Sequence, residues 1–131
     1  MTNYGCAKTF KKYWGYESFR FCQEKIIKSV LNNEDVLALM PTGGGKSLCY
    51  QLPAITREGL TLVISPLLAL MREQTAGLGK KNVLAEYLHS GQTQREQEIL
   101  MDNLHYGAVK LLYLSPERLQ NKRFLGENQH T

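Results

Sequence analysis

The sequence predicts an α/β fold in which a mainly parallel sheet is flanked by helices. Two observations predict it: apolar runs of strand length recur along the chain, and stretches with helical periodicity lie between them. Strands that alternate with helices form parallel sheets through right-handed crossover connections. With 131 residues, 43% of them hydrophobic, the chain has the size of one domain or of part of a larger one.

Four apolar runs are the predicted strands. They are continuous in hydrophobicity rather than alternating, as expected when helices cover both faces of a sheet. The runs are DVLALM at 35–40, LTLVIS at 60–65, VLAEYL at 83–88, which is the least certain of the four, and KLLYLS at 110–115.

Helices are predicted between these runs. Residues 19–31 repeat apolar side chains at helical spacing, and residues 67–78 place Leu67, Met71, Gln74 and Leu78 along one stripe that ends near two glycines. Residues 93–104 open with Thr93 and Glu96 at capping-box spacing, where each side chain can satisfy the other residue's backbone N–H.

Composition excludes several classes of protein. No apolar run approaches the roughly 18 residues that a membrane span requires, and the N-terminus lacks the apolar stretch of a secretory signal. Three cysteines with no C-x-x-C pair argue against a disulfide framework or a zinc site. We therefore expect an intracellular protein, cytoplasmic or, in a eukaryote, nuclear. The net charge of +4 is compatible with a polyanionic partner but is shared by many domains without one.

The segment PTGGGKS at 41–47 has the chemistry of a phosphate-binding loop. Its glycines let successive backbone N–H groups face a phosphate and permit φ angles that other residues avoid. Lys46 opens a helix whose N-terminus favours an anion, and its ammonium can reach the β- and γ-phosphates. The Ser47 hydroxyl can ligate Mg²⁺. The predicted cradle consists of Thr42, Gly43, Gly44, Gly45, Lys46 and Ser47.

The loop departs from the strict pattern G-x-x-x-x-G-K-[ST] at one position. Met40 stands where the pattern begins with glycine. This strand-side position contributes less to the cradle than the following residues do. The alternative, a glycine-rich turn with a surface lysine, is disfavoured by the strand pattern before the loop and the helical pattern after it. The sequence therefore predicts that the chain binds a nucleoside triphosphate.

Four stretches together resemble the N-terminal half of the first motor domain of RecQ-family DNA helicases, from about residue 14 to residue 125. The stretches are WGYESFRFCQEKII, LALMPTGGGKSLCYQLPA, LVISPLLALMREQ and LLYLSPERL. The resemblance implies an incomplete RecA-like ATP-binding domain, with ATP and Mg²⁺ as cofactors and Lys46 and Ser47 taking part in catalysis. It also implies 3′-to-5′ unwinding of single-stranded or partly duplex DNA, independent of base sequence, in recombination and repair.

The same resemblance implies an adenine-reading segment at about 14–31, upstream of the loop. The Gln23 amide can donate and accept, which suits the N6 and N7 edge of adenine. Arg20 and Tyr16 would stack on the base through a guanidinium plane and an aromatic face. Without the phosphate loop nearby, an amphipathic helix with a solvated glutamine would be the better interpretation.

In this family, residues at the ends of strands contact the sugar–phosphate backbone of DNA. The resemblance assigns this contact to Ser65, Ser90, Gly91, Ser115 and Arg118. For each polar residue taken alone, ordinary helix capping explains its position at least as well.

The acidic Asp-Glu-x-His motif that such motors use to hold Mg²⁺ and orient water has no counterpart here, since the chain contains no Asp-Glu pair. A second motor domain and accessory domains are also absent. We therefore expect a truncated or split helicase that binds ATP without efficient hydrolysis, leaves the apolar run 35–40 unpaired and has a complementing fragment as a possible partner. Two alternatives remain: a non-enzymatic, nucleotide-dependent module that binds nucleic acid or protein, and a small P-loop kinase.

Overall fold

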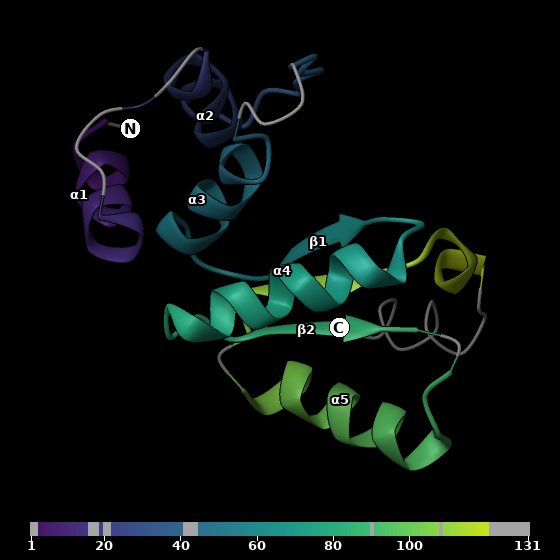
Figure 1. The fold of residues 1–131 in the computed structure, drawn as a ribbon. Helices are drawn as coiled ribbons and strands as arrows, with labels where there is room; N and C mark the ends of the chain where they lie inside the picture. The colour runs from purple at the N-terminus through teal and green to yellow at the C-terminus, as the bar shows by residue number, and fades with distance from the viewer. Residues whose placement is uncertain are drawn as a thin grey trace. The chain divides into compact units, whose positions relative to one another are not determined.

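The chain divides into two compact units, Met1–Gly59 and Leu60–Thr131, a division that its length did not predict. None of the described helices is long and apolar enough to cross a membrane. A computed structural model describes residues 3–15, 19, 22–40, 45–89, 91–107 and 109–120 (Figure 1).

The described part of the first unit contains three helices. α2 and α3 pack against each other, and α1 packs against α3. α2 confirms the helix predicted at 19–31 from Gln23 onward, whereas α1 was not predicted from the sequence. α3 follows the glycine loop as expected, but it begins two residues later than Lys46. The helices are α1 (Asn3–Trp14), α2 (Gln23–Leu31) and α3 (Leu48–Thr56).

Apolar side chains from all three helices form the core of this unit. The ring of Phe10 stacks on that of Phe19, with 4.7 Å between ring centroids. Burial of these side chains holds the helices of this unit together. The buried members are Phe10, Ile27, Leu48 and Leu52, and the partly buried ones are Trp14, Phe19 and Leu31.

The prediction of a strand at 35–40 is wrong. The segment has no regular secondary structure, and the side chains of Leu37 and Leu39 are each 87% exposed. A strand is stabilised by hydrogen bonds to a neighbouring strand. No strand of the described sheet pairs with this segment. The apolar side chains of Leu37 and Leu39 are therefore largely exposed rather than part of a strand.

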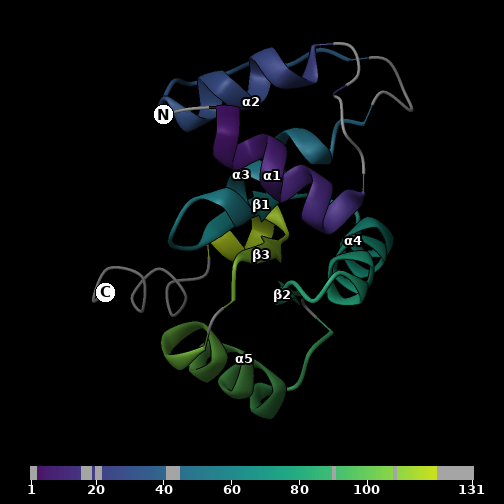
Figure 2. The same cartoon turned by 90° about the vertical axis from the view of Figure 1, so that its left-hand side faces the viewer.

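The second unit is an α/β unit and confirms the predicted fold class. Its three strands are parallel in the order β1-β3-β2. α4 and α5 lie on opposite faces of the sheet (Figures 1 and 2). The last three predicted strands and both predicted helices are confirmed. The elements are β1 (Thr61–Ile64), α4 (Leu68–Lys80), β2 (Ala85–Leu88), α5 (Gln94–Tyr106), β3 (Leu111–Leu114) and the 3₁₀ helix η1 (Pro116–Gln120).

β3 is the central strand, and all four of its residues are buried. Because successive side chains point to opposite faces, Leu112 and Leu114 face α5 while Tyr113 faces α4. The Tyr113 hydroxyl donates a hydrogen bond to Gln74 Oε1 of α4 at 3.0 Å. The cluster on the α5 side consists of Leu88, Leu100, Leu112 and Leu114, with Met101 and Leu104 packed against it.

β1 is covered less completely than the sequence predicted. Leu62 and Ile64 lie opposite Leu112 and Leu114 on the α5 side of the sheet, yet each is 44% exposed. The prediction that helices cover both faces holds for β3 and is wrong for β1. Among the described residues of this unit, α5 packs on the β2 side of the central strand, away from β1.

α4 keeps only part of its predicted apolar stripe. Met71 and Leu78 are buried, whereas Leu67 precedes the first helical residue and is 60% exposed. The helix passes Gly77 and ends at Lys80, so the glycines do not terminate it. Glycine has a low helix propensity, which disfavours the last turn of α4. Contacts of α4 with β2 and β3 outweigh this cost.

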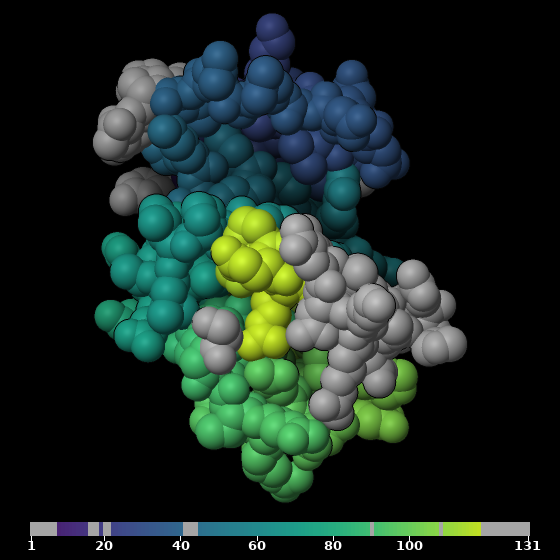
Figure 3. All heavy atoms as spheres, turned by 90° about the vertical axis from the view of Figure 1, so that its right-hand side faces the viewer, coloured from purple at the N-terminus to yellow at the C-terminus, as the bar shows by residue number. Residues whose placement is uncertain are grey.

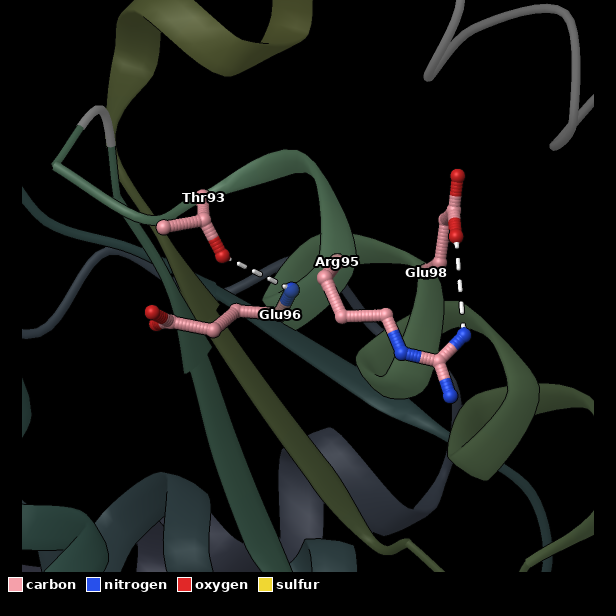
Figure 4. A network of polar contacts seen from close by, with 4 residues as sticks. All are labelled: Thr93, Arg95, Glu96 and Glu98. Atoms are coloured by element: carbon pink, nitrogen blue, oxygen red, sulfur yellow. Dashed lines mark hydrogen bonds and ion pairs between the residues drawn. The ribbon is translucent and has the colours of Figure 1, made fainter.

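The start of α5 has one of the two hydrogen bonds of the predicted capping box (Figure 4). Thr93 Oγ1 accepts a hydrogen bond from the Glu96 backbone N–H at 3.1 Å, which satisfies one of the free N–H groups of the first turn. Arg95 and Glu98 form an exposed ion pair at 3.8 Å, which contributes little to stability because water screens it. The cap therefore defines where α5 begins.

Candidate functional site

The first unit contains the described part of the predicted nucleotide site. Gln23 is the first residue of α2, and Gly45, Lys46 and Ser47 lead into α3. The other predicted nucleotide-binding residues lie outside the described part of the chain: Tyr16, Arg20, Thr42, Gly43 and Gly44.

Gln23 lies against the glycine loop. Its side chain is only 4% exposed, and Nε2 donates a hydrogen bond to the carbonyl oxygen of Gly45 at 3.2 Å. The predicted base-reading residue and the predicted phosphate loop are thus in contact, although 22 residues separate them. To contact a base, this amide would have to share or rearrange its present hydrogen bonds.

Gly45 has a local reason to be glycine. Its φ angle of +74° lies in the left-handed region that residues with a side chain rarely adopt. A Cβ atom at this position would also overlap the amide nitrogen of Gln23. Backbone conformation favours glycine here, and a side chain would also displace the Gln23 amide from its place against the loop.

Lys46 and Ser47 form the turn that leads into α3, and Ser47 is its N-cap. The carbonyl of Lys46 accepts from the Cys49 N–H at 3.1 Å, and that of Ser47 accepts from the Gln51 N–H at 2.9 Å. Ser47 already has helical angles, φ −59° and ψ −37°. The first N–H groups of a helix have no partner within it, which makes such a start suitable for an anion. Lys46 is exposed and Ser47 is half-buried.

Cys49 lies beside this loop as a buried thiol. Its Sγ is 3.9 Å from the Gly45 carbonyl oxygen and 3.8 Å from Met40 Sδ. Burial raises the pKa of Cys49, and the neighbouring Cys22 raises it further, so the thiol stays protonated at neutral pH. Within the described ranges, no three His, Cys, Asp or Glu side chains are grouped to hold a metal.

In the second unit, the three parallel strands end at one edge of the sheet. The register aligns Ile64, Leu88 and Leu114, so the residues after them come out side by side. Figure 3 looks onto this edge, where η1, in yellow, lies between α4, in teal, and α5, in green. The edge brings together four of the predicted DNA-contacting residues: Ser65, Gly91, Ser115 and Arg118. Ser90 lies outside the described part of the chain.

Ser65 has a structural role at this edge. It is 8% exposed, and its N–H donates to the carbonyl of Leu114 at 3.0 Å. Its Oγ accepts from the Leu67 N–H at 3.2 Å, which stabilises the turn into α4. Ser65 is not the N-cap of α4, which is Leu67; its contacts instead stabilise the turn before that helix.

Ser115 and Arg118 belong to the turn into η1. The Ser115 carbonyl accepts from the Arg118 N–H at 3.1 Å. The pKa of Glu117 is lowered by a hydrogen bond from its own backbone N–H and by one from the Ser115 side chain. A carboxylate beside Ser115 opposes a phosphate there, whereas the Arg118 guanidinium favours one.

The sequence did not identify two residues at this edge, His89 and Gln92. The His89 carbonyl accepts a hydrogen bond from Arg118 Nη2 at 2.6 Å. Gln92 hydrogen-bonds through both ends of its side-chain amide to the backbone around His89. The only signal in the sequence was their position in the short polar turn between a predicted strand and a predicted helix.

Known proteins are similar to this chain in sequence. The DEAD/DEAH box helicase family matches residues 20–130. The chain is 47% identical over 114 residues to the ATP-dependent DNA helicase RecQ of Haemophilus influenzae, over 87% of this chain and 18% of that protein. For RecQ of Pasteurella multocida the identity is 50% over 111 residues (85% and 18%), and for RecQ of Bacillus subtilis it is 44% over 114 residues (86% and 19%).

The chain spans less than a fifth of the length of these curated relatives. The family match covers the start of α2, the glycine loop, the parallel sheet and η1. The α/β unit is the architecture that the resemblance implied. The chain therefore belongs to the DEAD/DEAH box helicase family, within its RecQ group.

Proposed function

We propose that the chain is the ATP-binding portion of a RecQ-like 3′-to-5′ DNA helicase. The observation that carries the proposal is the contact between Gln23 and Gly45, because it joins a candidate base reader to a candidate phosphate loop. In this proposal residues 14–31 read adenine and residues 40–47 hold the phosphates. The whole protein would couple ATP hydrolysis to sequence-independent DNA unwinding in recombination and repair.

The residues of the first unit fit a magnesium–triphosphate in their chemistry. A glycine with positive φ, an exposed lysine and a hydroxyl occur in succession at the start of a helix. Lys46 would bind the distal phosphates, Ser47 would ligate Mg²⁺, and Thr42, Gly43 and Gly44 would complete the cradle. Bound Mg²⁺ neutralises charge that develops on the phosphates. Tyr16 and Arg20 would stack on the base.

Nucleotide preference tests this assignment. The unmutated chain should bind ATP more tightly than GTP, and Gln23→Ala should reduce that preference by about two- to tenfold, the effect of one neutral hydrogen-bond pair. Because Gln23 also contacts Gly45, the substitution should lower the affinity for both ATP and GTP. The ratio of the two affinities, from titrations with fluorescent ATP and GTP analogues, isolates base reading.

Gln94→Ala provides the matched control, because this glutamine is exposed on α5 in the other unit. It should leave the ratio unchanged. Equal affinities for ATP and GTP in the unmutated chain would count against adenine reading.

For the sheet edge, we propose sequence-independent contact with the backbone of single-stranded DNA through Arg118, Gly91 and the neighbouring turns. Binding should be weak, and its affinity should fall steeply between roughly 50 and 200 mM salt. This is the behaviour expected when cationic side chains of the protein release the counterions held by DNA phosphates. Arg118→Ala should reduce the salt slope by about 0.7, the contribution of one phosphate contact to a single strand. Fluorescence anisotropy with oligothymidine and mixed-sequence oligonucleotides measures both. Sequence-selective binding that persists at high salt would contradict the proposal.

A further inference from the structure

We propose that Gln92 is a positioning residue for nucleic-acid contact, because it fixes the turn after β2 to which Arg118 is bonded. This inference rests on the proposed function of the sheet edge. Gln92 would not touch DNA itself. It would keep the backbone of His89 and Gly91 in the position from which this edge of the sheet contacts nucleic acid.

Gln92 acts as a backbone substitute at the end of β2. Its Nε2 donates to the Tyr87 carbonyl at 3.0 Å, and its Oε1 accepts from the His89 N–H at 3.1 Å. β2 is an edge strand that pairs only with β3 in the described sheet. The amide of Gln92 thus supplies one donor and one acceptor to backbone groups of β2 and the turn, as a neighbouring strand would.

The turn is also closed by its own backbone and by the His89 ring. The Gln92 N–H donates to the His89 carbonyl at 3.3 Å, and the Gly91 N–H donates to His89 Nδ1 at 3.1 Å. The His89 ring stacks on that of Tyr87, with 5.3 Å between centroids. Three kinds of contact therefore converge on one short turn.

Arg118 connects this turn to the end of the central strand. Its Nη2 donates to the His89 carbonyl at 2.6 Å, while its backbone N–H donates to Ser115. The two side chains thus bond the two backbone groups of His89: Gln92 bonds its N–H, and Arg118 bonds its C=O. If the turn moves, the guanidinium loses the carbonyl that orients it toward the edge. Both ends of the Gln92 amide are bonded to the backbone of β2 and the turn, so we expect it to influence phosphate binding through this turn.

The test compares Gln92→Ala with Gln94→Ala, a control of identical chemistry two residues along the chain. Binding to a fluorescein-labelled oligothymidine should weaken by about fivefold in Gln92→Ala, the effect of losing ordinary hydrogen bonds, and should stay unchanged in Gln94→Ala. Hydrogen exchange of the His89 and Gly91 amides should accelerate in Gln92→Ala. The amides of Leu112 and Leu114 should keep their protection, which a general loss of stability would not allow.

A double-mutant cycle with Arg118→Ala tests the coupling. Both side chains act on His89. Arg118→Ala should therefore reduce oligothymidine affinity less in a chain that already carries Gln92→Ala than in the unmutated chain. Gln92→Met, which keeps the length and the apolar stem of the side chain, should reproduce the loss if Gln92→Ala fails to fold.

The possible results separate the two proposals. If the unmutated chain binds no oligothymidine, the proposed nucleic-acid function fails and the positioning role fails with it. If the unmutated chain binds and the folded Gln92 variant binds equally well, the positioning role alone is overturned. Additive losses in the cycle would overturn the link through Arg118.

Discussion

Replacing Lys46 with alanine should weaken ATP binding by about ten- to a hundredfold and leave AMP binding nearly unchanged. Lys46 is exposed and directly precedes the helical turn at Ser47. Its ammonium is therefore available to a ligand at the start of α3. Since only the β- and γ-phosphates would meet this charge, the loss should depend on the length of the phosphate chain. Titrations with fluorescent ATP, ADP and AMP analogues give the three affinities.

Lys25 provides the matched control for charge. It is an exposed lysine on α2 in the same unit, so Lys25→Ala removes the same net charge without changing the loop. ATP affinity should change little in this variant. Equal losses for ATP and AMP in Lys46→Ala would show that the ammonium does not meet the distal phosphates.

The strands and helices of the second unit could be predicted because local pattern and tertiary environment agree there. The run at 110–115 is apolar from Leu111 to Leu114, and this strand is buried on both faces. The run at 35–40 has the same apolar character but forms no strand. Strand formation depends on a partner, and no local pattern reports whether a partner is present. The same limit explains β1, whose apolar residues Leu62 and Ile64 remain partly exposed.

The chemistry of the candidate site could be predicted from residue types, but its contacts could not. The sequence identified Gln23 as a donor and acceptor and Gly45 as part of a phosphate loop. It did not predict that one would bond to the other, because the pairing depends on how α2 packs against α3. Gln92 was missed for a similar reason. A glutamine in a polar turn has the composition of any loop, and only the fold shows that both ends of its amide are used.

Replacing Gly45 with alanine should destabilise the first unit by about 2–3 kcal/mol, more than positive φ alone explains. Two effects combine. A residue with a Cβ at φ +74° costs roughly 1–2 kcal/mol. The new methyl group would also overlap the Gln23 amide nitrogen, which is buried and bonded to the Gly45 carbonyl. Urea unfolding followed by the fluorescence of Trp14, the single tryptophan of the chain, reports on this unit.

Gly15→Ala separates the two effects, because Gly15 has nearly the same φ, +78°, and no described residue beyond its chain neighbours has an atom within 4 Å of the position where its Cβ would lie. It should show the backbone cost alone, in the same unit and with the same fluorescent reporter. In a chain that already carries Gln23→Ala, the cost of Gly45→Ala should fall to that of Gly15→Ala, since the overlapping amide is gone. If Gly45→Ala and Gly15→Ala cost the same in the unmutated chain, then Gln23 moves aside freely. In that case its contact with the loop would not restrain the loop, and the proposed link between base reading and phosphate binding would lose its physical basis.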